Sequence, residues 1–299
     1  MNINKTIVSI CIITYNSSNT IIELLNSILY QSYGAENIEL VISDDKSQDS
    51  TVQVIETWLR NHKAAFFDVV FNINKENLGI SKNFEVTLSL STAEYIKTIA
   101  GDDILKTQAI ESYINFIKKA KSNIIFSKVE AFSYSNEKKI IHSICPNSNE
   151  NIKSFNLLSA KLQFERIFLR KKEITFKNNN YILPAPTLFF KRNLLHHIIN
   201  SPKGRNMEDY PTWLFLTGVK GEKIKVSTEI LVEYRTNTGI SFSYKKSLEN
   251  KNSNLKDSIF IKKYFVRYLG INKKPIVYIS IVNLYFKLFI NKIKISLKN

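Results

Sequence analysis

The chain has 299 residues, of which 44% are apolar and 12% aromatic, with eight glycines and six prolines. These values suit one large or two small globular domains and exclude a disordered, collagen-like or low-complexity chain. Two cysteines, Cys11 and Cys145, exclude a disulfide scaffold and a four-cysteine metal site, and they suit a reducing compartment.

The formal net charge is +16, and most of the excess lies near one end. Residues 245–299 contain 13 lysines and arginines against two acids. Such a basic segment indicates an anionic partner, either a membrane surface or a nucleic acid. The apolar stretch near residue 10 is short and interrupted, so we expect no signal peptide. No window holds about 18 uninterrupted apolar residues, so we expect no transmembrane helix.

The first 127 residues alternate between short apolar runs and longer amphipathic runs. Strands are predicted at residues 8–13, 38–43, 68–73, 95–99 and 124–127, and helices at 20–31, 49–61, 81–90 and 107–120. Capping boxes are predicted for Thr20 with Glu23 and for Ser50 with Gln53. The alternation predicts βαβ units, an α/β fold and a mainly parallel sheet, in which ligands bind outside the carboxyl ends of the strands.

The rest of the chain is less regular. We expect a helix at 154–171, an awkward central strand with two prolines at 181–190, a helix at 208–219 and a strand at 229–235. After residue 244 the pattern is helical to the end, with a break at 272–275. We therefore divide the chain into a first domain, residues 1–243, with halves 1–127 and 128–243, and a basic helical C-terminal extension, residues 244–299.

Acidic side chains follow two of the predicted strands. Asp44 and Asp45 follow the second strand, and Asp102 and Asp103 follow the fourth. Two pairs of acids at one edge of a sheet favour a bound Mg²⁺ or Mn²⁺ ion and a polar ligand. The alternative for the first pair is turn chemistry with Asp49 as a helix cap. The turn after the first strand has no glycine, which argues against a dinucleotide-binding fold, and no P-loop motif occurs.

Four ordered motifs resemble glycosyltransferase family 2. They read VSICIITYNSSNTIIELLNSILYQS, ELVISDDKSQDST, NLGISKN and EYIKTIAGDDIL, and the resemblance continues more weakly through NMEDYPTWLFL and VEYRTNTGISFS. The resemblance implies a GT-A fold and an inverting transfer of a sugar from a nucleotide diphosphate donor. It covers roughly residues 6–120 strongly.

The resemblance assigns the nucleotide site residue by residue. Thr14 and Tyr15 would line the nucleotide pocket, with Tyr15 against the base. Asp45 would accept a hydrogen bond from the imide N–H of uracil or thymine, which favours a UDP-sugar. Lys82 stands where the family often has an arginine near the nucleotide, and Asp102 would reach the ribose or the sugar.

The resemblance also assigns the reacting groups. Asp103 would ligate Mn²⁺ or Mg²⁺, and Asp209 of the acidic pair Glu208–Asp209 would be the general base. Tyr234 and Arg235 match an element that approaches the donor diphosphate. Each pair has a second interpretation: Glu208 and Asp209 are also reasonable first-turn acids of a helix, and Tyr234 and Arg235 a strand end at the surface.

The chain departs from the family pattern at two positions. Ala100 stands where many members have the first carboxylate of an acidic motif. Asn237 stands where many have a histidine, so a protein-donated imidazole contact to metal or phosphate is in doubt. The four histidines have no metal-binding spacing, and we assign them no role.

The expected enzyme is a metal-dependent hexosyl- or N-acetylhexosaminyltransferase. The acceptor would be a hydroxyl of a glycan or a lipid-linked oligosaccharide in the synthesis of a bacterial surface polysaccharide, O-antigen or capsule. The alternatives are a nucleic-acid-binding protein that uses the basic C-terminal segment, and a family-like protein that has lost catalysis. We favour the enzyme, with no nucleic-acid partner and with a homo-oligomer left open.

The C-terminal segment predicts a basic amphipathic helix. Its polar stripe contains Ser280, Asn283, Lys287, Asn291, Lys294 and Lys298. Its apolar face contains Ile279, Val282, Phe286, Phe289, Ile290 and Ile293. Such a helix can lie in the interface of an anionic membrane, which predicts a cytoplasmic enzyme on the inner face of the plasma membrane. The alternative is that the apolar face packs on the catalytic domain or on a second subunit.

Overall fold

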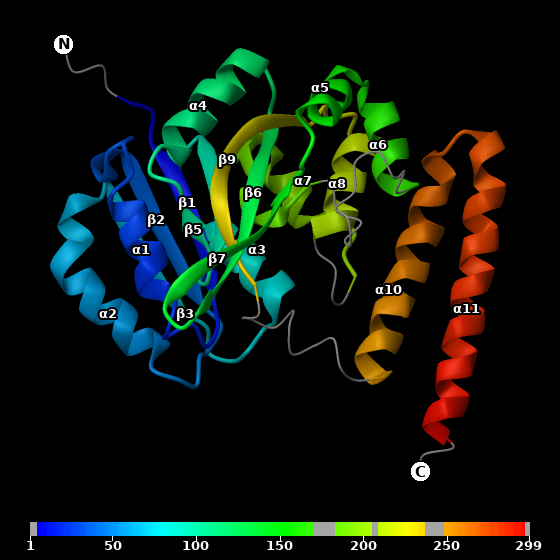
Figure 1. Ribbon diagram of the computed structural model, residues 1–299, viewed down its shortest axis with the longest axis horizontal. Helices are drawn as coiled ribbons and strands as arrows, with labels where there is room; N and C mark the ends of the chain where they lie inside the picture. Colours follow the sequence, from blue (N-terminus) through cyan, green and yellow to red (C-terminus); the bar gives the residue numbers. More distant parts are fainter. Residues whose placement is uncertain (1–4, 170–182, 205–208, 237–247, 297–299) are drawn as a thin grey trace.

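The computed structural model describes residues 5–169, 183–204, 209–236 and 248–296. The described strands form one sheet of nine strands in the order β3-β2-β1-β4-β8-β6-β9-β5, with β7 paired to β6 (Figure 1). The strands are β1 Val8–Thr14, β2 Ile38–Asp44, β3 Asp68–Ile73, β4 Tyr95–Ala100, β5 Ile104–Leu105, β6 Ile124–Ser135, β7 Lys138–Cys145, β8 Phe189–Lys191 and β9 Lys225–Arg235.

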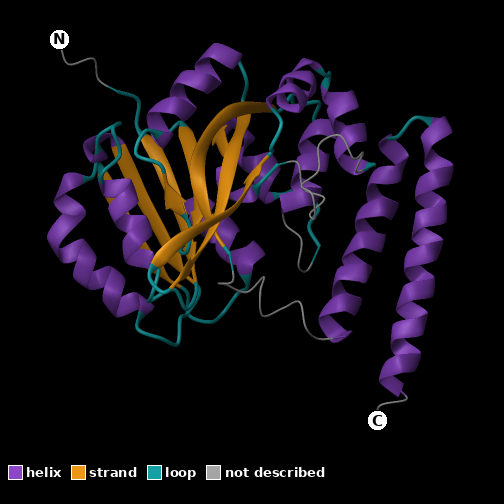
Figure 2. Ribbon diagram, viewed as in Figure 1, coloured by secondary structure: helices purple, strands orange, loops and turns teal. Residues whose placement is uncertain are grey.

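Helices cover both faces of the sheet, and two long helices stand side by side at one end of the molecule (Figure 2). The helices are α1 Ile21–Leu29, α2 Thr51–His62, α3 Ile80–Leu90, α4 Ala109–Ala120, α5 Asn149–Leu157, α6 Ala160–Phe168, α7 Leu195–Ile199, α8 Asp209–Gly218, α10 Leu248–Phe265 and α11 Lys274–Ser296.

Alternation along β1 explains the two layers of core. Ile10 and Ile12 pack with α1, α2 and α4, whereas Cys11 points to the opposite face, where α3, α6, α7 and α8 lie. Because both faces are covered, β1 and β2 read as continuous apolar runs. The parallel pairing of β3, β2, β1 and β4 confirms the predicted βαβ organisation.

A hairpin joins β6 and β7, and it was absent from the sequence interpretation. The predicted strand at 124–127 continues to Ser135, and the chain then returns along β7. Asn136 and Glu137 form the turn with φ values of 47° and 62°. Two consecutive left-handed residues are typical of a type I′ hairpin turn, but the Asn-Gly or Asp-Gly signal is missing here.

Other boundaries also differ from the sequence interpretation. The region 154–171 holds two helices, α5 and α6, because Ser159 caps a second start by accepting a hydrogen bond from Leu162 N. In the described part of the predicted strand 181–190, which begins at residue 183, the strand is limited to Phe189–Lys191, since Pro184 and Pro186 bring a 3₁₀ turn before it. The break between the last helices begins earlier than predicted, at Val266–Tyr268.

Both predicted capping boxes are wrong. Neither Thr20 nor Ser50 makes a side-chain cap hydrogen bond. Thr20 Oγ1 instead donates to the carbonyl oxygen of Gly101 at 3.0 Å, and the Glu23 carboxylate turns toward Arg235. At the second helix, Asp49 accepts from Thr51 N at 3.0 Å and from Ser18 N at 3.2 Å. A tertiary partner thus replaces the local cap at Thr20, whereas at the second helix Asp49 caps the first turn in place of Ser50.

Candidate active site at the carboxyl ends of the strands

The ends of β2, β1 and β4 lie at one edge of the sheet. The ladder pairs Thr14 with Asp44 and Ile13 with Ala100. Beyond the ladder, Asp45 N donates to the Thr14 carbonyl at 2.9 Å, and Gly101 N donates to the Ile13 carbonyl at 3.0 Å. The residues that follow these three strands, including both acidic pairs, are therefore neighbours.

Asp103 is a buried acid at this edge, and one of its carboxylate oxygens has no hydrogen-bond partner among the described residues. Its side chain is buried, and Oδ1 accepts a hydrogen bond from the backbone N–H of Arg235 at 3.2 Å. The other oxygen, Oδ2, is buried and has no hydrogen-bond partner among the described residues. Burial, and secondarily the neighbouring charge of Asp102, raises the pKa of Asp103 well above its usual range. A carboxylate held in this way favours a proton or a cation.

The Asp103 surroundings fit a divalent ion that is also held by a ligand. Among the residues that the structure describes, no cluster of three or more histidine, cysteine, aspartate or glutamate side chains comes together. Mg²⁺ commonly binds through one or two carboxylates and completes its coordination with substrate phosphates and waters. The unpartnered Oδ2 of Asp103 is the kind of oxygen ligand that such an ion needs.

Arg235 lies against Asp102 and Asp103 and is almost fully buried. Its Nε donates to the Asp102 carbonyl oxygen at 3.0 Å, and its Nη2 pairs with the Glu23 carboxylate of α1. The guanidinium carbon lies 4.9 Å from the ring centre of Phe132 and 5.2 Å from that of Tyr134. The arginine is therefore held in place by aromatic faces and an acid, as planar guanidinium groups allow.

Glu23, Phe132 and Tyr134 are members of the site that the sequence interpretation missed. The Tyr134 hydroxyl donates to Glu23 Oε1 at 2.8 Å, so the acid joins the β6–β7 hairpin to Arg235. The sequence signal for Glu23 was an acid in the first turn of a helix, which we interpreted as part of a capping box. The aromatic pair depended on a hairpin that the sequence did not indicate.

The Asp45 carboxylate organises the loop that leads into α3. Oδ1 accepts from Leu78 N at 2.8 Å and from Asn74 Nδ2 at 2.9 Å, and Oδ2 accepts from Gly79 N at 2.8 Å. Gly79 has a φ of 80°, a conformation that glycine adopts without strain. Asn83, buried beneath, accepts from Asn74 and from Ser43. This buried polar network fixes Asp45 at the sheet edge.

Three further predicted residues have distinct environments. Thr14 Oγ1 is buried and unpartnered within the described part of the chain, and a β-carbon on Gly101 would lie only 2.8 Å from it. Tyr15 is half-buried in the loop after β1. Lys82 is exposed in the first turn of α3, and its Nζ lies 2.8 Å from Glu85 Oε2.

The predicted base lies on α8. Asp209 is the first described residue of this helix, and its Oδ1 accepts from Tyr210 N at 2.5 Å. Trp213, one turn further along, stacks edge-on against Phe126 of β6 with ring centres 4.9 Å apart. Glu208 lies outside the described residues. The roles of both acids stay predictions.

A buried lysine supports the strand that leads to Asp103. Lys97 of β4 is fully buried, and its Nζ donates to the carbonyl oxygens of Thr98 at 2.6 Å and Pro186 at 2.5 Å. Burial lowers the pKa of Lys97 to about 7, although the negative field of Asp103 works in the opposite direction. This lysine ties β4 to the turn before β8.

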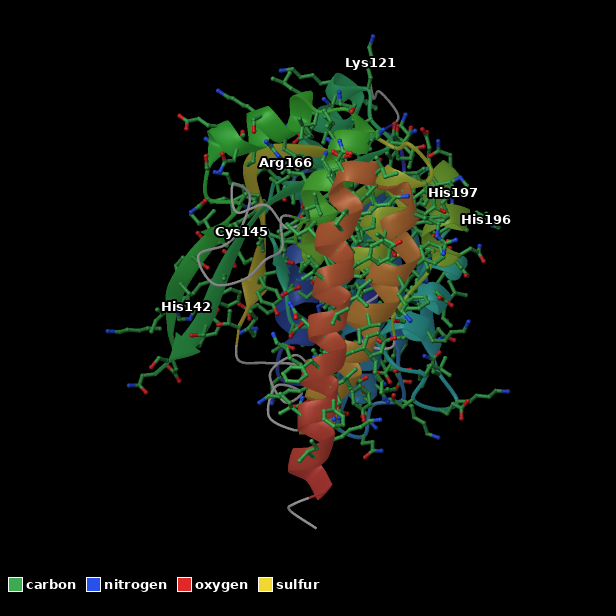
Figure 3. All side chains as sticks on the ribbon, turned by 90° about the vertical axis from the view of Figure 1, so that its right-hand side faces the viewer. Lys121, His142, Cys145, Arg166, His196 and His197 are labelled. Carbon is green, nitrogen blue, oxygen red and sulfur yellow. The ribbon has the colours of Figure 1, made fainter. Side chains whose placement is uncertain are left out.

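Histidines and cysteines play no part at this edge. Figure 3 shows His142 on one side of the molecule and His196 with His197 on the other. His142 Nε2 lies 2.8 Å from Ser133 Oγ of the same hairpin. Both cysteines are buried, and burial raises the pKa of Cys11 to about 12. Cys11 is therefore a small apolar core residue, as expected.

Comparison with known proteins identifies the family of this chain. The family model described as "Glycosyl transferase family 2" matches residues 9–198. Abequosyltransferase RfbV of Salmonella typhimurium is 36% identical over 104 residues, which are 35% of this chain and 30% of that protein. Glycosyltransferase GlyG of Streptococcus pneumoniae is 22% identical over 234 residues, 78% of this chain and 72% of that protein. In the first two curated relatives, the matched part spans only 26–30% of the relative's length.

Solved structures have the same architecture. S. aureus TarS 1–349 in complex with UDP-GlcNAc has a TM-score of 0.61 at 19% identity, covering 94% of this chain and 73% of that chain. Mannosyltransferase PcManGT from Pyrobaculum calidifontis, in complex with GDP-Man and Mn²⁺, has a TM-score of 0.58 at 14% identity, covering 96% and 70%. At these identities the likeness shows the fold, and it confirms the predicted GT-A architecture with a helical C-terminal part.

Proposed function

This chain belongs to glycosyl transferase family 2, and from that premise we propose that it transfers a sugar from a nucleotide diphosphate donor to a hydroxyl. The donor is a UDP-sugar, the sugar a hexosyl or N-acetylhexosaminyl group, and the acceptor a glycan or lipid-linked oligosaccharide of bacterial surface-polysaccharide synthesis. The observation that carries the proposal is the buried Asp103 carboxylate, whose Oδ2 lacks a partner among the described residues at the strand-end edge. The family match lends no support to the nucleic-acid-binding alternative.

Asp45 selects the base in this proposal. A carboxylate offers about four acceptor positions, and hydrogen bonds from Asn74, Leu78 and Gly79 use three of them. The remaining position on Oδ2 accepts from the N3–H of uracil or thymine. Thr14, Tyr15, Lys82 and Asp102 complete the nucleotide pocket around it. The donors UDP-GlcNAc and GDP-Man of the structural neighbours support a nucleotide-sugar ligand.

Asp103 would hold the divalent ion, and Asp102 beside it would reach the ribose or the sugar. Mn²⁺ or Mg²⁺ supplies Lewis-acid stabilisation of the diphosphate when bound. The Mn²⁺ complex of PcManGT supports a cation in this fold. Arg235, fixed by Glu23 and by the rings of Phe132 and Tyr134, presents a permanent positive charge next to these acids. That charge favours the departing diphosphate by charge-assisted hydrogen bonding.

Asp209 takes the proton from the acceptor hydroxyl as the oxygen attacks the anomeric carbon, with Glu208 beside it. A base in hydrogen-bond reach contributes about 10²- to 10⁴-fold to the rate. A single displacement of this kind inverts the anomeric centre and needs no covalent intermediate with the protein.

The C-terminal helix α11 attaches the enzyme to the inner face of the membrane. Five residues of the predicted apolar face, Ile279, Val282, Phe286, Phe289 and Ile293, are 43–66% exposed. A different stripe, Val277, Ile281 and Leu288, is buried in the core that also contains Ile259 and Phe265 of α10. The exposed residues of the predicted apolar face therefore do not pack on the catalytic domain, and a second subunit stays the alternative to the membrane.

The membrane proposal is for a helix that lies in the interface. Among the described helices, the span Ile271–Ile293 is long and apolar enough to cross a membrane by length and composition. The sequence expectation of no such helix rested on the lack of an uninterrupted apolar run, whereas this span qualifies by its mean hydropathy. One stripe of α11 packs against α10 and the rest of the helix is exposed, so we propose that α11 lies on the bilayer surface rather than crossing it.

Competition between nucleotides tests the enzymatic proposal. UDP with Mn²⁺ should raise the melting temperature of the protein and displace a labelled UDP-sugar, whereas GDP and ADP should do so far more weakly. Asp45→Asn should remove this preference because an amide presents a donor as well as an acceptor. A stronger effect of GDP or ADP on the unaltered protein would contradict the assignment of Asp45.

A further inference from the structure

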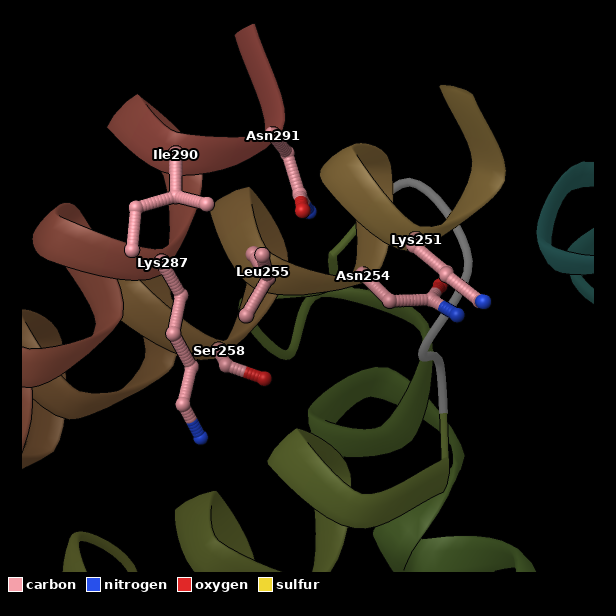
Figure 4. Close-up of a pocket in the computed structure, with 7 residues that line it drawn as sticks. All are labelled: Lys251, Asn254, Leu255, Ser258, Lys287, Ile290 and Asn291. Carbon is pink, nitrogen blue, oxygen red and sulfur yellow. The ribbon is translucent and has the colours of Figure 1, made fainter. Parts of the chain in front are cut away.

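An open groove lies between α10 and α11, away from the sheet edge. Its volume is about 470 Å³. Figure 4 shows Lys251, Asn254 and Ser258 from α10 and Lys287 from α11 around it. Leu255 and Ile290 supply the apolar part, and Asn291, which also lines the groove, donates to Asn252 at 2.9 Å across the two helices.

Two lysines and no acid line the groove, although the sequence of α10 also contains Glu249 and Asp257. Lys251 and Lys287 are exposed, and within the described ranges neither forms an ion pair with an acidic side chain. No acidic residue occurs anywhere in the sequence of α11, residues 274–296. Figure 4 shows the Lys251 and Lys287 side chains at opposite ends of the groove. As exposed lysines, both can turn toward a phosphate held between them, with the Ser258 hydroxyl and the Asn254 amide as further donors.

The groove borders the exposed apolar side of α11. Lys287 directly follows Phe286, which is 64% exposed, and Ile290 directly follows Phe289, which is 60% exposed. A lipid that entered from this side would meet apolar side chains with its acyl carbons and ammonium groups with its phosphate. Long lysine side chains beside an apolar face are typical of helices in a membrane interface.

We propose that the α10–α11 groove binds the phosphate of an anionic phospholipid when α11 lies on the membrane. This inference rests on the membrane attachment proposed above and gives it a defined binding site. Lys251 and Lys287 bind the phosphate, Asn254 and Ser258 orient it, and Leu255 and Ile290 contact the first carbons of the lipid. The groove is thus a headgroup site separate from the nucleotide site.

Vesicle binding by the full-length protein tests the groove. We compare phosphatidylcholine vesicles with and without phosphatidylglycerol, for the unaltered chain and for the double variant Lys251→Gln/Lys287→Gln. Each lysine near an anionic surface contributes about fivefold, so the double variant should bind the phosphatidylglycerol vesicles about 30-fold more weakly. Lys118→Gln/Lys119→Gln on α4 is the matched control, because both lysines are exposed and the charge change is identical.

The outcomes separate the groove from membrane attachment. If Lys251→Gln/Lys287→Gln binds like the unaltered chain, or if the α4 control loses as much, the groove is not a phosphate site. Phe286→Ser/Phe289→Ser tests the apolar face, and its unchanged binding would overturn the role of this face of α11 in membrane attachment. Inorganic phosphate should compete with the vesicles no better than chloride at the same ionic strength, because it lacks the acyl carbons. Full displacement by phosphate alone would assign the groove to free phosphate instead of a lipid. None of these variants should change sugar transfer to a soluble acceptor, so the enzymatic proposal is judged independently.

Discussion

The strand-end edge and the α11 helix depart from ordinary protein structure in opposite ways. At the edge, carboxylates and an arginine are buried, and two oxygens there, Thr14 Oγ1 and Asp103 Oδ2, lack partners among the described residues. Along α11, isoleucines and phenylalanines are exposed. A buried polar atom without a partner costs free energy, and so does exposed apolar surface. In the proposals above, something outside the chain completes each region, polar in one case and apolar in the other.

Replacing Asp103 by asparagine tests the strand-end edge and should have the largest effect on sugar transfer of the variants considered. We expect about a 10³-fold loss of sugar transfer in Mn²⁺, because the variant lacks the anionic oxygen that is proposed to hold the cation. The melting temperature should not fall, because the buried carboxyl is costly to ionise. Asp68→Asn, at the exposed start of β3, is the matched control. Full activity of the unaltered enzyme in EDTA would contradict a role for the metal.

Replacing Asp209 by asparagine separates proton transfer from donor binding. Turnover should fall by about 10²-fold or more with little change in UDP-sugar affinity, because a general base acts on the acceptor in the transition state. Single-turnover kinetics and donor titration measure the two quantities. A collapse of donor affinity with turnover preserved would assign Asp209 to the nucleotide site instead.

Replacing Glu23 by glutamine tests whether the acid that holds Arg235 acts through position. We expect about a tenfold decrease in kcat/KM, because a misplaced charge stabilises the leaving group less. Glu23→Asp should recover part of the loss. Glu130→Gln is the control, since Glu130 pairs with Lys106 at 3.2 Å and not with the arginine. Equal effects of Glu23→Gln and Glu130→Gln would indicate a general effect on the hairpin.

Glu39 provides a contrast with Asp103, because it is also a buried acid but accepts several hydrogen bonds. It lies near the opposite end of β2 and accepts from Thr92 N at 2.8 Å, from Thr92 Oγ1 at 2.6 Å and from Ser9 Oγ. Burial alone would raise the pKa of Glu39, but these hydrogen bonds hold it below its usual range. Its stabilisation is therefore present above the pKa of an unfolded glutamate and is lost as pH falls through the lower folded value.

Glu39→Gln should lower the free energy of unfolding by about 1–3 kcal/mol at neutral pH, because buried donors lose their acceptor. The difference from the unaltered chain should shrink in acid, as measured by urea unfolding at several pH values. Activity per folded molecule should stay unchanged. A loss of activity without a loss of stability would mean that the two ends of the sheet are not functionally distinct.

The sequence by itself determined the βαβ half and the carboxyl-end acids. Hydrophobic periodicity and turn residues are local signals. They therefore predicted strands β1 to β4 and helices α1 to α4 with boundaries within a few residues of those in the structure. A parallel sheet brings its strand ends together whatever the loops do, which is why Asp45, Asp102 and Asp103 were expected at one edge. The apolar stripes of α11 were also visible, because a helix repeats every 3.6 residues.

Tertiary structure alone decided which partner each of these groups has. Glu23 reads as a cap in sequence, but Arg235 lies more than 200 residues away and pairs with it across the sheet edge. The β6–β7 hairpin turns through Asn136 and Glu137, which carry no strong turn signal, and it supplies Tyr134. Which stripe of α11 is buried was set by α10. Periodicity reports that a helix has faces, whereas only packing decides which face meets the core and which meets the surroundings.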